Sequence, residues 1–248
     1  MANTEILKQV GLRMKILGTI CARGGSKGVR NKNIRDLNGK PLIYYTIDVM
    51  KKWGKADRII CSTDSPEIAR MADEYGAETP FMRPPELATD TAPKIPVIQH
   101  ALRFCEKEYD EIYDVVMDLD PTSPIRTTHD IDAVLDEFVR SKAKVLYSVT
   151  EAKKNPYFNM VELDAGGNAH LSKASAGEVF RRQDAPKVYS MNGSIYCYDR
   201  NYLIDAKSLH CDRERVYVMD EVSSVEIDRE IDFKFIEFLL SSGSFKFE

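Results

Sequence analysis

The stretch MKILGTICARGGSKGVRNKN (14–33) joins an apolar run to a loop rich in glycine and positive charge. Its first part, MKILGTICA (14–22), is typical of a buried β-strand. Three glycines in the loop let the backbone turn tightly and present N–H groups to an anion. The loop carries four cations, Arg23, Lys27, Arg30 and Lys32, with no acidic residue before Asp36. A strand that ends in such a loop predicts a phosphate-binding site at its carboxyl end.

The loop matches neither of the two commonest phosphate-binding patterns. In G-x-x-x-x-G-K-[ST] a hydroxyl residue follows the lysine, whereas Gly28 follows Lys27 here, and no G-x-G-x-x-G is present. A basic loop that is merely solvated therefore stays open as the alternative interpretation.

Short β-like runs alternate with amphipathic helical runs from residue 14 to residue 152. Strands are expected at 14–22, 57–63, 79–83, 115–120 and 144–152, and helices at 41–53, 65–75, 98–105 and 131–138. This alternation predicts an α/β fold with a mostly parallel, doubly wound sheet and helices on both faces. Ligands of such sheets bind beyond the carboxyl ends of the strands, so we expect the chemistry just after residues 22, 63, 83 and 120.

The pattern changes at residue 153. Residues 158–173 resemble a hairpin with its turn around 164–168, and 193–199 and 215–220 are expected strands. A final helix is expected to have Ile231, Phe235, Phe238 and Leu239 as its apolar face. We therefore expect one domain over 14–240 with a small β-rich insertion at 153–190, preceded by an N-terminal extension (1–13).

Composition narrows the classes of function. The 248 residues are 43% hydrophobic and 30% charged, as in an ordinary globular protein. The net charge of −4 argues against a nucleic-acid binder, whose affinity would come from a basic excess. No apolar run approaches roughly 18 residues, so no transmembrane helix is expected. Five widely spaced cysteines are typical of free thiols. We expect a cytoplasmic protein that binds neither nucleic acid nor a membrane.

Five segments, in order along the chain, carry a resemblance to one enzyme family. They are ICARGGSKGVRNKN (20–33), RPPELATDTA (83–92), LDPTSPIRT (119–127), RRQDAPKVYSMNGSIY (181–196) and SVEIDREIDF (224–233). Together they resemble the motifs of the sialic-acid-type (acylneuraminate) cytidylyltransferases, which make CMP-activated nine-carbon acidic sugars from CTP. The resemblance implies a fold like that of nucleotide-diphospho-sugar transferases, a homodimer with 153–190 as the dimerisation insertion, and dependence on Mg²⁺ or Mn²⁺.

Two positions depart from the sialic-acid enzymes. Asp120 stands where they usually carry a glutamine that contacts the sugar, and Glu226 stands where their acidic pair usually begins with aspartate. The first departure, with NPYFNMVE (155–162) and RRQDAP (181–186), looks more like the branch that activates legionaminic acid, a bacterial diamino relative of sialic acid.

The implied reaction is attack by the anomeric hydroxyl of a 2-keto sugar acid on the α-phosphorus of CTP, with release of pyrophosphate. Arg23 and Lys27 are the implied catalytic cations on the triphosphate. The implied CTP-binding residues are Ala22, Arg23, Gly24, Gly25, Ser26, Lys27, Lys32, Asn33, Arg83 and Asp90. Arg83 has an alternative interpretation as a surface residue before a proline turn, and Thr91 as a helix cap.

The resemblance implies sugar contacts from two of the segments. They are Asp120, Thr122, Ser123, Arg182, Gln183 and Asn192. A proline-bracketed turn at 121–124 and a simple turn at 192–193 are the alternative interpretations.

Glu226 and Asp228 alternate with apolar residues. In an extended segment residues i and i+2 point to the same side, so both carboxylates can face one metal ion. Asp228 is the third implied catalytic residue, and its alternative role is the N-cap of the last helix. No residue stands out as a general base, which leaves Asp228 and a metal-bound hydroxide as alternatives.

Three other functions compete with this interpretation. A cytidylyltransferase for the eight-carbon acid KDO would share the fold and reaction, although 181–186 and 224–228 fit it less well. A metal-dependent glycosyltransferase usually lacks the Arg-Ser-Lys loop. A non-catalytic nucleotide-sensing module would need no acidic pair at 226–228.

Overall fold

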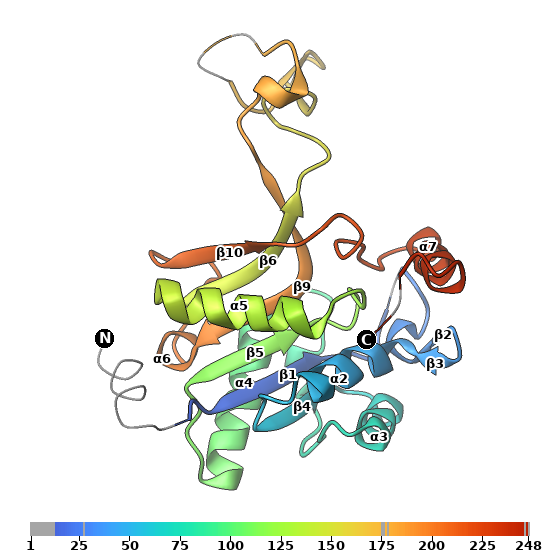
Figure 1. Cartoon of the computed structure of the whole chain (residues 1–248), viewed down its shortest axis with the longest axis vertical. Helices are drawn as coiled ribbons and strands as arrows, with labels where there is room; N and C mark the ends of the chain where they lie inside the picture. The colour runs from blue at the N-terminus through green and yellow to red at the C-terminus, as the bar shows by residue number, and fades with distance from the viewer. Residues whose placement is uncertain (1–12, 27, 175–176, 178, 246, 248) are drawn as a thin grey trace.

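A six-stranded sheet forms the centre of the computed structural model, which describes residues 13–26, 28–174, 177, 179–245 and 247 (Figure 1). The strand order is β10-β6-β9-β5-β1-β4. The strands are β1 (Ile16–Cys21), β4 (Arg58–Ser62), β5 (Val115–Leu119), β6 (Val145–Glu151), β9 (Tyr189–Asp199) and β10 (Glu214–Val218). Only β9 runs antiparallel to its neighbours among these strands. The predicted mostly parallel α/β sheet is confirmed.

Helices cover both faces of the sheet (Figure 1). α2 (Leu42–Trp53) and α5 (Thr128–Ser141) share a core with Ile16, Val115 and Met117, whereas α4 (Lys94–Tyr109) and α6 (Arg200–Leu203) share one with Leu17 and Val116. Because successive strand residues point to opposite faces, this split places the two helical layers on opposite sides. The predicted double winding is therefore confirmed.

The remaining elements surround this core. α3 (Pro66–Tyr75) packs beside α2, and α7 (Glu230–Ser241) packs through Phe233, Ile236 and Leu239 against the start of α2. Two short strands pair as β2 (Asp36–Leu37) and β3 (Lys40–Pro41), and single 3-10 turns are η1 (Lys32–Ile34), η2 (Pro85–Leu87) and η3 (Arg182–Asp184). No helix among the described residues is both long and apolar enough to cross a lipid bilayer.

Local sequence explains where several helices begin and end. The Ser65 hydroxyl accepts a hydrogen bond from the Ile68 N–H at the start of α3, and Thr127 and Asp130 form a reciprocal capping box on α5. α2 and α3 both end at a glycine with positive φ, Gly54 and Gly76, which is the usual way to stop a helix.

The described residues of 153–190 project from the sheet between the ends of β6 and β9 (Figure 1). Their described part carries the antiparallel hairpin of β7 (Val161–Leu163) and β8 (Ala169–Leu171), whose turn is held by hydrogen bonds to Asp164. The hairpin expected over 158–173 is confirmed. The N-terminal extension expected at 1–13 lies, except for Arg13, outside the described residues.

Two expectations about individual elements are wrong. Residues 79–83 form no strand, and among the described residues a single bridge, between Ile60 and Glu78, extends the sheet beyond β4. Pro80 has no N–H to donate to a β-ladder, and the Arg83 N–H turns back to the Thr63 carbonyl.

The second error concerns α7. Of the four residues expected on its buried face, only Leu239 is buried, and Ile231, Phe235 and Phe238 are exposed. The helix carries apolar residues around most of its circumference, so periodicity alone could not distinguish the face that packs.

Candidate active site

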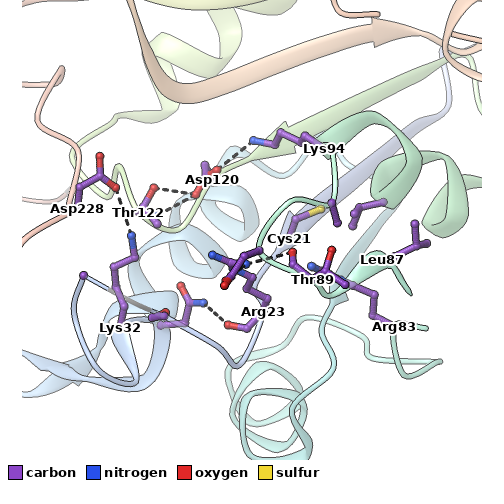
Figure 2. Close-up of a pocket in the computed structure, with 16 residues that line it drawn as sticks. Cys21, Arg23, Lys32, Arg83, Leu87, Thr89, Lys94, Asp120, Thr122 and Asp228 are labelled. Carbon is purple, nitrogen blue, oxygen red and sulfur yellow. Dashed lines mark hydrogen bonds and ion pairs between the residues drawn. The ribbon is translucent and has the colours of Figure 1, made fainter. Parts of the chain in front are cut away.

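A cavity of about 400 Å³ opens at the carboxyl ends of β1, β4 and β5 (Figure 2). Nine of the predicted site residues line it: Arg23, Ser26, Lys32, Asn33, Arg83, Asp90, Asp120, Thr122 and Asp228. Segments far apart in the sequence therefore meet at the sheet edge where a ligand is expected.

The loop after β1 is held in place by hydrogen bonds from its neighbours. The Ala22 N–H donates to the Ser62 carbonyl, the Gly24 N–H donates to Asp64 Oδ1 at 2.8 Å, and Asn33 Nδ2 donates to the Arg23 carbonyl at 3.0 Å. Ala22, Gly24 and Gly25 form the loop backbone but do not line the cavity. Lys27 lies outside the described residues, so its predicted contact with the triphosphate stays a prediction.

The Arg23 guanidinium, labelled in Figure 2, is paired with an acidic side chain that also lines the cavity. Its Nη1 lies 2.7 Å from Asp90 Oδ1 and also donates to the Thr89 carbonyl at 3.1 Å. Asp90 therefore orients Arg23 and balances its charge.

Lys32 joins the loop to the acidic segment on the other side of the cavity. Its Nζ donates to the Ile227 carbonyl at 2.5 Å and lies 3.6 Å from Asp228 Oδ1 (Figure 2). The predicted nucleotide-binding lysine thus also supports the predicted metal ligand.

The two acidic residues of that segment occupy different environments. The Asp228 side chain is 68% exposed and lines the cavity. Glu226 is half-buried and does not line the cavity, and its Oε1 lies 3.4 Å from the Thr122 hydroxyl. Burial, followed by the nearby charges of Asp228 and Asp120, raises the pKa of Glu226.

The described residues contain no group of three or more histidine, cysteine or acidic side chains arranged to hold a metal. A cation bound at Asp228 and Glu226 would therefore need oxygen ligands from a substrate, which is how Mg²⁺ is commonly held beside phosphates.

The structure also tests the alternative cap assignments. At the start of α7 the Asp232 carboxylate accepts from the Arg229 N–H at 2.8 Å and pairs with the Arg229 guanidinium, and Asp228 contributes no side-chain cap. α4 has Pro93 at its N-cap, with no side-chain hydrogen bond there. The alternative interpretations of Asp228 and Thr91 as helix caps are wrong.

Arg83 is almost fully buried although it lines the cavity. Its Nε donates to Ser62 Oγ at 3.1 Å, and its Nη2 donates to the Ser62 carbonyl. The alternative interpretation of Arg83 as a surface residue is wrong.

A cluster that sequence reasoning missed closes one end of the cavity. Lys94 Nζ lies 2.9 Å from Asp118 Oδ2. It also lies 3.1 Å from Asp120 Oδ2 (Figure 2). Lys94 is the first residue of α4, where the helix dipole disfavours a cation. A lysine directly after the proline at a helix start was the available signal, because such a lysine needs a nearby anion to offset the dipole.

The charges of this cluster stabilise one another. Burial disfavours the charged form of Lys94, but Asp118 and Asp120 outweigh it and raise the pKa of Lys94 well above its usual value. Burial would likewise raise the pKa of Asp120, but Lys94 and the hydrogen bonds from Thr122 hold it below its usual value. Both side chains are therefore ionised at neutral pH.

Four predicted sugar-binding residues lie away from this cavity. Ser123 and Asn192 are buried beneath it, where Ser123 Oγ donates to the Asn192 carbonyl and Ser148 Oγ donates to Asn192 Oδ1. Arg182 and Gln183 lie in η3 on the projecting segment, outside the cavity of their own chain.

Comparison with known proteins identifies the family. The family model described as cytidylyltransferase matches residues 17–242. CMP-N,N'-diacetyllegionaminic acid synthase from Campylobacter jejuni is 42% identical over 227 residues, which are 92% of this chain and 95% of that protein. N-acylneuraminate cytidylyltransferase from Escherichia coli is 34% identical over 224 residues, 90% of this chain and 51% of that protein.

A solved structure of CMP:2-keto-3-deoxy-manno-octonic acid synthetase complexed with CTP shares the fold. It superposes with a TM-score of 0.67 at 15% identity and covers 92% of this chain and 99% of that one. The matched sequence region contains all five segments that carried the resemblance, and the relatives match over nearly the whole chain. The chain therefore belongs to the cytidylyltransferase family, in its sialic-acid-type group.

Proposed function

We propose that this cytidylyltransferase couples CTP to a nine-carbon 2-keto sugar acid of the legionaminic or sialic acid type, giving the CMP-sugar and pyrophosphate. The observation that carries the proposal is the arrangement of one cavity, in which the cationic loop after β1 faces the carboxylate of Asp228. The identity to the legionaminic acid synthase supports the substrate class.

In this reaction the main task of the protein is to place positively charged groups beside the reacting phosphates. The anomeric hydroxyl attacks the α-phosphorus while the bond to pyrophosphate breaks, so negative charge moves onto the leaving group. Arg23, which lines the cavity, would stabilise that charge, and from the sequence we predict that Lys27 does so as well. Asp90 keeps Arg23 extended across the cavity until the triphosphate replaces it as partner.

We expect Mg²⁺ or Mn²⁺ to bind at Asp228 and Glu226 together with phosphate oxygens of CTP. The two carboxylates suit this role because Asp228 is open to the cavity, and because Glu226, whose pKa is raised first by burial and then by the charges of Asp228 and Asp120, would gain a compensating charge from a cation. When bound, the ion would neutralise phosphate charge in the transition state. Lys32 holds the segment that carries both carboxylates.

We also propose a cytoplasmic homodimer. One face of the β7–β8 hairpin is apolar and exposed, with Val161, Leu163 and Leu171 at its surface. A second copy would cover this face, as symmetric oligomers commonly do. It would also give Arg182 and Gln183 a pocket to contact, because their own chain's cavity lies elsewhere.

Pyrophosphate release from CTP and Mg²⁺ against a panel of sugar acids tests the function. We expect turnover with legionaminic or sialic acids and little with the eight-carbon acid KDO. Preference for KDO would favour the alternative cytidylyltransferase. Sugar transfer from a ready-made sugar nucleotide, without pyrophosphate release, would favour a glycosyltransferase.

A further inference from the structure

The turn that follows β4 holds the buried arginine of the cavity. The Ser62 carbonyl and hydroxyl both accept hydrogen bonds from the Arg83 guanidinium, and the Thr63 carbonyl accepts from the Arg83 N–H at 2.7 Å. Arg83 is buried and still lines the cavity (Figure 2). The residues at the end of β4 therefore fix the direction of one cation of the site.

The same turn also holds the backbone on both sides of Arg23. The Ser62 carbonyl accepts from the Ala22 N–H at 3.0 Å, and Asp64 Oδ1 accepts from the Gly24 N–H at 2.8 Å. Arg23 thus lies on a short piece of backbone that is held at both ends, and its side chain enters the cavity from there (Figure 2).

The turn that carries Asp64 is itself fixed to the core. Thr63 Oγ1 accepts from the Ser65 N–H at 3.1 Å, and the Ser65 hydroxyl accepts from the Ile68 N–H at the start of α3. Ile68 belongs to the same buried cluster as Ile20 of β1. A shift of Asp64 would therefore disturb the packing of α3 against the sheet, and the carboxylate offers the loop a fixed point.

Asp64 contacts the loop and not the space for the ligand. It is half-buried and does not line the cavity, so its direct partner is the loop backbone. Gly24 comes close enough for this bond because it has no side chain: a Cβ there would lie 3.0 Å from Ser65 Cβ. A backbone N–H has one hydrogen, and a charged acceptor holds it more firmly than a neutral one. The bond therefore fixes the peptide that follows Arg23.

We propose that Asp64 is a positioning residue for the nucleotidyl transfer, which directs the Arg23 guanidinium at the triphosphate of CTP by holding the Gly24 N–H. The partners of the guanidinium, Asp90 and the Thr89 carbonyl, are those that a triphosphate would replace. The backbone bond to Asp64 persists through that exchange, so it can keep the side chain aimed when the ligand is bound. The inference rests on the proposed reaction with CTP and on no particular sugar acid.

The test compares Asp64→Ala with Asp64→Asn in initial rates of pyrophosphate release, using the sugar acid that the wild-type protein turns over fastest. Asp64→Ala should lower kcat/KM for CTP about tenfold to a hundredfold, the effect of a displacement of about 1 Å in a positioned group. Asp64→Asn removes the charge but keeps an acceptor oxygen, so its kcat/KM should stay within about threefold of the wild-type value.

Asp73→Ala is the matched control. Asp73 Oδ1 also accepts from a backbone N–H, that of Thr79 at 2.9 Å, but it does so near the other end of α3 and outside the cavity. The control loses the same kind of bond, so its urea midpoint should fall about as far as that of Asp64→Ala. Its kcat/KM for CTP should stay within about threefold of the wild-type value, because it holds no part of the loop.

Two further variants separate positioning from folding. Arg23→Ala removes the group through which Asp64 acts, so adding Asp64→Ala to it should change kcat/KM by less than about twofold. Gly24→Ala disturbs the same contact from the loop side, because its Cβ would meet Ser65. It should lower kcat/KM in the wild-type background and add little to Arg23→Ala, and it carries the test if Asp64→Ala does not fold.

Three results would overturn the inference: wild-type rates for Asp64→Ala, equal losses for Asp64→Ala and Asp64→Asn, or losses that multiply when Asp64→Ala is combined with Arg23→Ala. The second result would assign the effect to the charge of the carboxylate. A wild-type preference for the eight-carbon acid KDO would refute the proposed sugar class and leave this inference standing. A wild-type protein that releases no pyrophosphate with any sugar acid would refute both, so the failures are distinguishable.

Discussion

The Cα of Gly28 faces the backbone carbonyl of Asp228 so closely that a Cβ on Gly28 would come within 1.9 Å of that oxygen. The contact continues in the side chains on either side, because Val29 and Ile227 are buried in the same apolar cluster. The phosphate loop and the acidic segment therefore hold each other in place across about 200 residues of sequence, and neither can shift without the other.

Gly28→Ala should consequently lower kcat/KM for CTP about a hundredfold, because a displacement of about 1 Å in positioning groups has effects of that size. The overpacked contact should also reduce the free energy of unfolding by about 1–3 kcal/mol. Gly25→Ala is the control, since nothing lies within 4 Å of a Cβ at that position. Equal behaviour of the two variants in steady-state kinetics and denaturant unfolding would show that the contact can relax.

Asp228→Asn should reduce turnover by about two orders of magnitude or more at saturating Mg²⁺, as expected when a group that stabilises transition-state charge is lost. Glu230→Gln tests for a general effect of removing charge nearby, because its carboxylate pairs with Arg35 outside the cavity. The turnover of the Glu230→Gln variant should stay within about threefold of the wild-type value, because exposed ion pairs contribute little to stability. Near-normal kcat for Asp228→Asn would assign the carboxylate a structural role only.

The strand and helix pattern predicted most of the fold because each element leaves a periodic signal in sequence. The signal was ambiguous where more than one face was apolar, as in α7, where Phe233 and not Phe235 is buried. It was misleading at 79–83, where apolar and β-prone residues follow the sheet edge without joining it. Which surfaces meet depends on tertiary packing, and a local pattern does not contain that information.

Some residues of the candidate site could likewise be predicted from sequence, and others could not. The loop cations and Asp228 could be predicted because they belong to contiguous motifs, but Lys94 and Asp118 are brought together only by the pairing of β5 and the start of α4 with β1. The sequence left open whether Ser123 and Asn192 have ligand-binding or structural roles, since a hydroxyl or amide looks alike in sequence whether it faces a ligand or a neighbouring carbonyl.

Arg23→Ala should weaken turnover with every sugar acid by the same factor, about tenfold to a hundredfold, because its predicted contact is with the triphosphate that all the reactions share. Arg30→Ala is the matched control, as this exposed arginine belongs to the same loop but does not line the cavity. Initial rates of pyrophosphate release with two sugar acids provide the comparison. A loss confined to one sugar would place Arg23 in the sugar pocket.

Arg126 bonds to the backbone that carries the cavity residues Asp120 and Thr122, so it should contribute to the free energy of unfolding. Its guanidinium is buried and donates to the carbonyls of Asp120, Ser123 and Ser194. Arg126→Met leaves these acceptors unsatisfied and should cost about 3 kcal/mol or more of unfolding free energy. Arg140→Met, at an exposed ion pair, should cost less than about 1 kcal/mol in the same urea titration. Similar midpoints for both variants would contradict this structural role.

The β7–β8 hairpin provides a test of assembly, because its two faces differ in chemistry. Val161, Leu163 and Leu171 form the exposed apolar face, and Glu162 and His170 pair on the opposite face. Leu163→Asp places a charge on the surface that a partner would cover, so it should convert a dimer into a monomer of 28.2 kDa in light scattering. His170→Asp introduces the same side chain on the other face and should stay dimeric.

The Leu163→Asp monomer should still bind CTP, since Arg23 and Asp228 of its own chain line the cavity. It should use the sugar acid poorly, because Arg182 and Gln183 would no longer reach a partner's pocket. A wild-type protein that is monomeric and fully active would refute the dimer and leave the hairpin's apolar face without a role.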